Sequence, residues 1–369
     1  MYRGMKAPVV STPRLKWLLG CVTILLTTFI LYVFLYNEPR ATVLAYPQPQ
    51  VNIIPNQLDK HSVHKDECDR SKPLVVWKPK GRLGNIICEY VHLLKLADFF
   101  SVDIRTSVSM HEALAPIFPH LSVKTPSSPC ESERLKHVAW ITYPKARERL
   151  LNQTNRAELL VIWDTPCDVM QIWQSRLQWL SEFIVNSELK EAAALRLQNM
   201  TRNVESLKNF TVDDDTTLVG IHVRRSDYWT VLDKYNFGGV LPRQYYEAAF
   251  KYYRKRFEKP LFIVITEPGE YDWCRENLSK NSRDVILADD RRSPEEDLIL
   301  LSSFAHIIYS HGSFGVWGIL LSEAETVAYP DHKNDGDKVR YPPHQAFDEI
   351  GKMQNRTEYI TIMYKSGEE

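Results

Sequence analysis

Two adjacent arginines, Arg224 and Arg225, directly follow a short apolar segment of the chain. The apolar residues 218–223 predict a buried strand, so the two arginines would stand at its carboxyl end. Ligands of open parallel sheets bind outside this edge. Because guanidinium groups bind phosphate oxygens bidentately, the pair predicts a site for a diphosphate. The structural alternative is a strand end closed by salt bridges.

Two neighbours of the arginine pair have side chains that could take part in such a site. Asp227 could orient one guanidinium, or bind the ribose or the base of a nucleotide. His222 alternates with Leu218 and Gly220, so it is equally well explained as a hydrogen-bonded histidine of the core.

A glycine-containing loop, residues 81–85, separates a predicted strand over 74–77 from a predicted helix over 86–100. Backbone amides at the start of a helix can bind an anion. Arg82 and Asn85 are unusual in such a turn. A tight turn followed by a helix cap explains the glycines without any ligand.

A second loop of this kind, residues 312–317, follows the predicted strand 306–310 and precedes a segment of small residues. Close backbone packing is sufficient to explain Gly315 and Gly318. The loop would nevertheless lie at the same edge of the sheet as the arginine pair.

Metal binding and the common hydrolase mechanisms have little support in the sequence. The acidic run 213–215 precedes a strand instead of following one, which favours a solvated turn over a metal clamp. The chain contains no CxxC pair, no GxSxG and no HExxH.

One cysteine, Cys21, lies in an apolar run. The pairing of the other five stays open: Cys68, Cys88, Cys130, Cys167 and Cys274.

Strands and helices alternate through the second half of the chain. Strands are predicted over 218–223, 261–266, 284–288, 306–310 and 326–329. Helices are predicted over 169–184, 187–203 and 243–258, and another begins at Ser293 with Pro294 at its first position and Glu296 at its third. This order predicts an α/β fold with a parallel, doubly wound sheet. Two α/β halves joined near residue 215 suggest a cleft between them.

The N-terminus predicts a membrane anchor. Residues 18–36 are uncharged and would form a helix of about 28 Å, close to the hydrocarbon thickness of a bilayer. Basic residues precede this stretch, which predicts a cytosolic tail over 1–17 and a lumenal remainder. A cleaved signal peptide is the alternative. Residues 37–72 are rich in proline and polar residues and predict a stem.

The sequons favour a lumenal protein, whereas the charge balance bears only on nucleic-acid binding. The 46 basic and 46 acidic residues balance, which gives no support to nucleic-acid binding. Five N-x-S/T sequons predict glycosylation on exposed loops, at Asn152, Asn199, Asn209, Asn277 and Asn355.

The order of these motifs resembles the α-1,2-fucosyltransferase family. That family has a GRxGNQ-type loop, an HVRRGDY segment, an apolar strand before an acidic-aromatic-cysteine segment, and an acidic helix leading to GTFGxW. The corresponding residues here are 81–85, 222–228, 262–266 with 272–274, and 296–298 with 312–317. Ile86, Ser226 and Ser313 replace the family's Gln, Gly and Thr, and these departures bear on the acceptor more than on the donor.

The resemblance implies a GT-B-like pair of Rossmann-type domains, over 73–215 on the acceptor side and 216–369 on the donor side. It implies a Golgi type II membrane enzyme that transfers fucose from GDP-fucose to a terminal galactose of a glycan, with inversion and without a metal or other cofactor. The catalytic residues would be Arg224, Arg225 and Asp227. The donor-binding residues would be His222, Arg82, Gly84, Asn85, Asp297, Ser313 and Phe314.

Three questions stay open at this point. The general base could be Asp227, or alternatively Asp233, Glu89 or Asp297, and a dissociative reaction could proceed without one. A non-catalytic glycan-binding protein on a transferase-like fold is a second hypothesis. A fucosyltransferase with a different acceptor is a third. The sequence does not indicate an oligomeric state.

Overall fold

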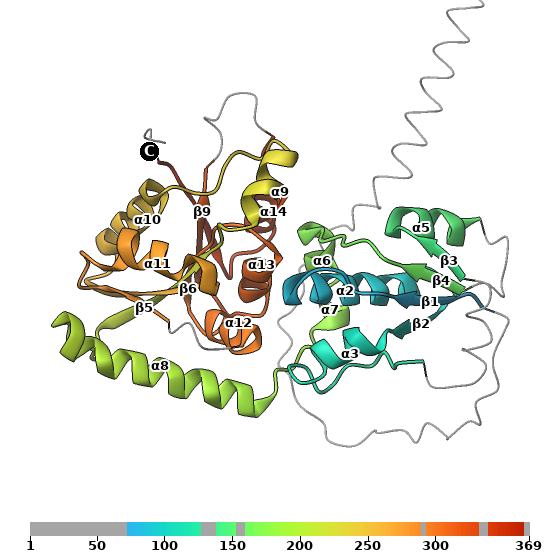
Figure 1. Ribbon diagram of the computed structural model, residues 1–369, viewed down its shortest axis with the longest axis horizontal. Coiled ribbons are helices and arrows are strands. Elements are labelled where there is room, and N and C mark those ends of the chain that lie inside the picture. Colours follow the sequence, from blue (N-terminus) through green and yellow to red (C-terminus); the bar gives the residue numbers. More distant parts are fainter. Residues whose placement is uncertain (1–71, 127–137, 153–158, 289–292, 332–338, 365–369) are drawn as a thin grey trace, which may run out of the picture. The chain divides into compact units, whose positions relative to one another are not determined.

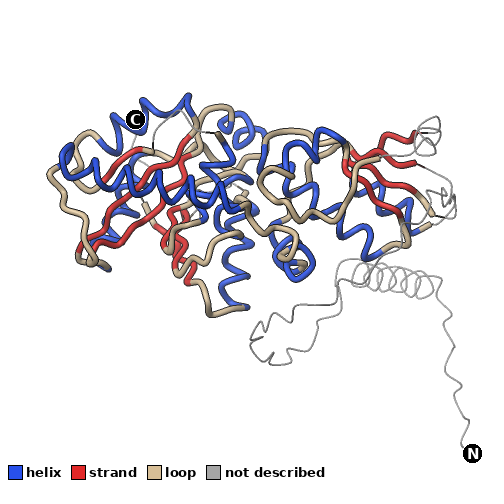
Figure 2. The backbone as a smooth tube through the Cα atoms, turned by 90° about the horizontal axis from the view of Figure 1, so that it is seen from below, coloured by secondary structure: helices blue, strands red, loops and turns tan. Residues whose placement is uncertain are grey.

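The computed structural model describes residues 72–126, 138–152, 159–288, 293–331 and 339–364. Within these residues, ten strands form two separate sheets, and every strand pair in both sheets is parallel (Figure 1). Figure 2 shows the strands of each sheet in red with helices in blue around them. The predicted α/β class with parallel strands is therefore confirmed.

The first sheet has four short strands in the order β2-β1-β4-β3. Their bounds are β1 (Leu74–Trp77), β2 (Asp103–Thr106), β3 (Val138–Ile141) and β4 (Leu159–Ile162). The sequence predicts β1 but not the other three strands, because prolines interrupt the apolar pattern between them. The central strands β1 and β4 pair with Trp77 opposite Ile162.

The second sheet has six strands in the order β10-β9-β8-β5-β6-β7. Their bounds are β5 (Thr216–Val223), β6 (Lys259–Thr266), β7 (Val285–Leu287), β8 (His306–Ile308), β9 (Thr326–Pro330) and β10 (Glu358–Ile362). The last five residues of β5 are buried, as the apolar segment 218–223 predicts for a central strand. Gly220 permits close packing there, since a Cβ would lie 2.4 Å from the Phe304 ring.

Helices lie both before and after β5 along the chain. Before β5 they are α2 (Leu83–Phe99), α3 (Val108–Leu114), α5 (Tyr143–Leu151), α6 (Val169–Gln174), α7 (Arg176–Trp179) and α8 (Ser187–Lys208). After β5 they are α9 (Tyr228–Lys234), α10 (Arg243–Arg256), α11 (Tyr271–Cys274), α12 (Pro294–Ser302), α13 (Ser313–Leu320) and α14 (Pro342–Met353), with short turns η2 (Pro268–Glu270) and η3 (Arg275–Ser279).

Some helix bounds differ from the predictions. The predicted helix over 169–184 is wrong: it is two short helices, α6 and α7, because the Ser175 hydroxyl donates to the carbonyls of Gln171 and Ile172 at the break. α2 begins three residues earlier than expected. The predicted start of α12 is confirmed, since Ser293 accepts from the Glu296 amide with Pro294 at the first position.

Helices α2 and α13 pack together within one hydrophobic core. Trp317 of α13 meets Trp179 with ring centroids 5.3 Å apart, and its Nε1 donates to Cys88 Sγ of α2 at 3.2 Å. Cys88 forms a disulfide with Cys167. This bond ties α2 to the segment before α6. Cys274 is a buried free thiol.

The predicted tail, anchor and stem, up to residue 71, lie outside the described residues, as do Cys68 and Cys130. None of the helices that the structure describes combines the length and apolar character needed to cross a bilayer. The predicted cleft and the domain boundary near residue 215 stay predictions. Four sequon asparagines are exposed, namely Asn152, Asn199, Asn209 and Asn355. The expectation that all lie on loops is wrong, because Asn199 lies within α8.

Candidate active site

Strand register brings Arg224 beside a carboxylate at the edge of the second sheet. Val223, the last residue of β5, pairs with Thr266, the last residue of β6. The next residues along the two strands are Arg224 and Glu267, which form an ion pair. Arg224 also pairs with Asp227, three residues further on. The Arg224 side chain is only 11% exposed, and the two carboxylates hold its largely buried guanidinium in place.

Arg82 approaches the same two carboxylates from the glycine loop of the first sheet. Its Nη1 lies 2.8 Å from Glu267 Oε2, and its Nη2 lies 3.0 Å from Asp227 Oδ2. Two guanidiniums, Arg82 and Arg224, therefore share one pair of acids. Arg82 and Asp227 are more than half exposed, which leaves this network open to an incoming ligand. Phosphate oxygens could replace the carboxylates as partners of both guanidiniums.

Arg225 turns away from this network, so the adjacent arginines do not act as one fork. Its Nη1 donates to the Leu241 carbonyl at 2.5 Å, and its guanidinium carbon lies 3.8 Å from the centroid of the Trp273 ring. Glu270 is 3.5 Å from its Nε and also accepts from the Ser226 amide at 2.7 Å. These contacts fix the loop that carries Arg224 and Asp227.

The loop after β8 lies against the arginine loop. Gly312 has φ = 90°, and a Cβ there would lie 3.7 Å from Arg224 Cγ. Ser313 Oγ donates to Asn85 Oδ1 at 2.6 Å, which joins this loop to the glycine loop of the first sheet. The N-caps Arg82 and Gly312 make no side-chain cap bond. The amino ends of α2 and α13 thus meet beside the guanidiniums, where the positive ends of both helix dipoles favour an anion.

Gly84 makes the contact between these two helix starts possible. A Cβ at Gly84 would lie only 2.5 Å from the backbone nitrogen of Phe314. Gly84→Ala is therefore expected to reduce the free energy of unfolding by about 2 kcal/mol, as overpacking does. Denaturant unfolding measures this change. Gly239→Ala is the matched control, because no atom lies within 4 Å of its Cβ. Equal stability of the two variants would contradict the proposed contact.

His222 belongs to the core. Its ring is 5.6 Å from Phe314 and 6.1 Å from Tyr309, and Nδ1 lies 3.4 Å from Ser310 Oγ. Burial lowers the pKa of His222 to about 4, so the ring is neutral at physiological pH. The core alternative stated for this residue therefore has direct structural support.

The other acidic candidates lie on different elements of the fold. Asp297 lies 2.6 Å from Nη1 of the buried Arg196, which joins α12 to α8. Asp233 is exposed on α9. Asp213 of the acidic run 213–215 pairs with Lys259 at the amino end of β5, the opposite end of the strand from Arg224. That position agrees with a surface turn.

Glu89 is a fully buried carboxyl group on α2. Both of its oxygens accept from the Lys80 amide, at 3.2 and 3.3 Å. Burial raises the pKa of Glu89 to about 8, and the nearby Asp164 adds to this rise. Glu89 is therefore protonated at neutral pH and below, in contact with the loop that leads to Arg82.

Glu89→Gln is expected to change how stability depends on pH. Because the folded pKa lies above the unfolded value of about 4.3, the stabilisation by Glu89 is fully present below that value and is lost as pH rises to about 8. Because glutamine imitates the protonated acid, the stability of the variant relative to the wild type should rise by roughly 3 kcal/mol between pH 5 and pH 8. Thermal unfolding at both pH values measures this gain. A pH-independent difference would contradict the buried-acid interpretation.

Several residues that build the site were missed from the sequence. Glu267 directly follows the predicted strand 261–266, so the rule that located Arg224 would have located it too. No motif or spacing in the sequence pointed to Tyr341. Its hydroxyl accepts from the Gly312 amide at 3.0 Å and contacts the Tyr228 hydroxyl, which holds the loops after β5 and β8 together.

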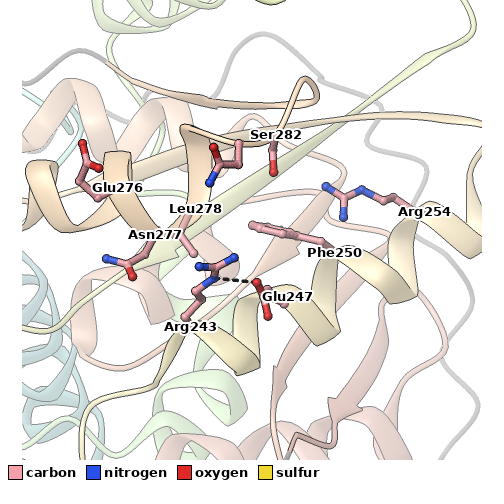
Figure 3. Close-up of a pocket in the computed structure, with 9 residues that line it drawn as sticks. Arg243, Glu247, Phe250, Arg254, Glu276, Asn277, Leu278 and Ser282 are labelled. Carbon is pink, nitrogen blue, oxygen red and sulfur yellow. Dashed lines mark hydrogen bonds and ion pairs between the residues drawn. The ribbon is translucent and has the colours of Figure 1, made fainter. Parts of the chain in front are cut away.

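A separate hollow lies on α10 and η3 (Figure 3). Its lining includes the ion pair of Arg243 with Glu247. It also includes Asn277, whose Nδ2 donates to the Trp273 carbonyl at 2.9 Å. Of the five predicted glycosylation residues, Asn277 is the one that is part-buried. None of the predicted donor-binding residues lines this hollow.

The model of glycosyl transferase family 11 matches residues 50–341. The chain belongs to glycosyl transferase family 11. Galactoside 2-alpha-L-fucosyltransferase SEC1 of Bos taurus is 30% identical over 278 residues, which is 73% of this chain and 70% of that protein. Galactoside alpha-(1,2)-fucosyltransferase 1 of Bos taurus is 32% identical over 257 residues, 68% of this chain and 66% of that protein.

Solved structures resemble this family 11 chain only loosely. The E. coli ADP-heptose LPS heptosyltransferase II aligns with a TM-score of 0.40 and 12% sequence identity, over 78% of this chain and 90% of that one.

Proposed function

We propose that the protein transfers L-fucose from GDP-fucose, in α-1,2 linkage, to a terminal galactose of a glycan. The family and the activities in the names of its relatives support this reaction. The observation that carries the proposal is the network in which Arg82 and Arg224, from different sheets, share Asp227 and Glu267. Two convergent guanidiniums suit the diphosphate of a nucleotide sugar.

The reaction breaks the bond between fucose C1 and the β-phosphate oxygen, and the electron pair leaves with GDP. Arg82 and Arg224 would stabilise the negative charge that develops on this oxygen. The galactose 2-hydroxyl oxygen forms the new bond to C1 from the opposite face, with inversion. Its proton passes to a base or to solvent. Asp227 is the nearest exposed carboxylate to both guanidiniums.

Arg225 would act through the loop instead of touching the donor, because Glu270, Leu241 and Trp273 hold its guanidinium. Asn85, Ser313 and Phe314 lie where the two helix starts meet and would contribute backbone amides. A GT-B-like arrangement of the two sheets and a reaction without a required metal are parts of this proposal.

The full chain in detergent, incubated with labelled GDP-fucose and a galactose-terminated acceptor, tests the proposal. We expect label in the acceptor with EDTA present, and linkage analysis should assign it to the galactose 2-position. An acceptor capped at that hydroxyl is the matched control. If the label is found on another sugar, that sugar would be the acceptor in place of galactose. No transfer with either EDTA or manganese would contradict it.

The proposal includes a Golgi membrane location, with the catalytic residues in the lumen and residues 18–36 as a type II anchor. The uncharged stretch and the basic residues before it support this topology. Protease treatment of intact microsomes should leave the part of the chain after residue 36 intact. Digestion of that part without detergent would overturn the topology and leave the reaction untouched.

A further inference from the structure

Two tryptophans are exposed on neighbouring strands of the first sheet. Trp140 of β3 is 58% exposed, and Trp163, directly after β4, is 41% exposed. β3 and β4 are paired strands with Ile141 opposite Ile162. Exposed large aromatic side chains that gather at one place often mark a binding surface. The proposed donor network uses neither of them.

The register of the first sheet brings these tryptophans to the loop that carries Arg82. Trp77 pairs with Ile162, and the Lys78 amide donates to the Ile162 carbonyl at 2.9 Å. Lys78 and Trp163 therefore leave the sheet side by side. Lys80, two residues before Arg82, places its Nζ 5.1 Å from the Trp163 ring centroid. Lys78 Nζ lies 5.2 Å from the Trp140 ring.

Buried groups hold this surface in place. Glu89 accepts from the Lys80 amide with both of its oxygens. Asp164, the residue after Trp163, accepts from the Tyr143 amide at 2.7 Å, and its carbonyl accepts from Trp77 Nε1 at 3.1 Å. The backbone on both sides of the Trp163–Lys80 contact is thus fixed before any ligand binds, which lowers the entropic cost of binding.

We propose that Trp163 and Lys80, with Trp140 and Lys78 beside them, form the subsite for the acceptor glycan. This inference rests on the proposed function. A pyranose ring offers an apolar C–H face, which can stack on the indole of Trp163, and hydroxyls, which can accept from the Lys80 ammonium. Because Arg82 lies two residues after Lys80, this surface borders the loop that carries the proposed donor site.

The same side chains would also suit a bilayer surface, where tryptophan and lysine are common. The glycan is favoured because the tryptophans stand at the edge of the sheet that also carries Arg82. The lysine–tryptophan contacts are weak enough to be exchanged for a sugar, at about 0.5–1 kcal/mol each at an exposed site.

Steady-state kinetics with varied acceptor and saturating GDP-fucose test the subsite. Trp163→Ala should raise the acceptor KM about tenfold, the change that ~1.4 kcal/mol produces, with the donor KM unchanged. Trp163→Phe keeps an aromatic face and should stay within about threefold of wild type. Lys80→Met keeps the apolar stem and should raise the acceptor KM about threefold, which covers the case in which Trp163→Ala does not fold.

Phe99→Ala is the matched control. Phe99 is 56% exposed with Lys95 Nζ 5.8 Å from its ring, but it lies at the other end of α2 from Arg82. Its acceptor KM should equal that of wild type. An unchanged acceptor KM in Trp163→Ala and Lys80→Met would overturn the subsite. A lower activity of Trp163→Ala in lipid vesicles but not in detergent, at an unchanged acceptor KM, would assign the surface to a membrane instead. An inactive wild type would refute the proposed function itself, which is a different result.

Discussion

Arg224→Ala is expected to lower the rate of fucose transfer by about a thousandfold, the upper range for removing one group that stabilises developing charge. The reason is geometric. Arg224 follows the central strand of the second sheet and is held by Glu267 and Asp227, the two acids that also bind Arg82. Without it, the charge on the leaving phosphate loses its most buried cation. Transfer of labelled fucose at saturating donor and acceptor measures the effect.

Two variants make this result interpretable. Arg224→Lys keeps the charge but loses the bidentate geometry, so it should recover only part of the rate. Arg243→Ala removes an arginine whose ion pair with Glu247 lies in the separate hollow on α10, and it should leave the rate unchanged. Circular dichroism controls for folding. If Arg224→Ala transferred fucose at a rate within tenfold of wild type, the proposed role of Arg224 in the reaction would be contradicted.

Replacing both Cys88 and Cys167 by alanine is expected to reduce the free energy of unfolding by about 4 kcal/mol. The disulfide closes a loop of 79 residues, and closure entropy in the unfolded chain grows with the logarithm of that length. The bond also holds α2, which begins beside Arg82, to the segment before α6. Denaturant unfolding without reductant measures the loss.

Cys274→Ala is the control for this pair. Cys274 is buried and free, so its replacement removes a side chain but no cross-link, and about 1 kcal/mol should be lost. With reductant present, the wild type should approach the double variant. An unchanged unfolding midpoint in the double variant would show that the bond does not stabilise the fold.

The parts of the site that follow from local pattern could be predicted. A strand that is apolar along most of its length implies burial on both faces, so residues 218–223 located the central strand and placed Arg224 at its carboxyl end. The same reasoning located the glycine loop before α2 and the start of α12 at Ser293. In each case, neighbours in the sequence determine the conformation.

The parts that depend on pairing between distant segments could not be predicted. The sharing of Asp227 and Glu267 by Arg82 depends on how α2 packs on α13, and no spacing in the sequence encodes that contact. Adjacent arginines suggested one diphosphate fork, whereas Arg225 turns to Trp273 and Leu241. Asp297 was expected to bind the donor, but Arg196 of α8 holds its carboxylate.

The affinity of the full chain for GDP, measured by calorimetry in EDTA, tests the central claim most directly. The claim is that fixed guanidiniums, foremost Arg224 with Arg82, hold the donor diphosphate without a metal. Wild type should bind GDP, and Arg224→Ala should bind it about 30-fold more weakly, from ~2 kcal/mol for hydrogen bonds to a charged group. Equal affinity of the two proteins, or GDP binding only after a divalent metal is added, would contradict the claim.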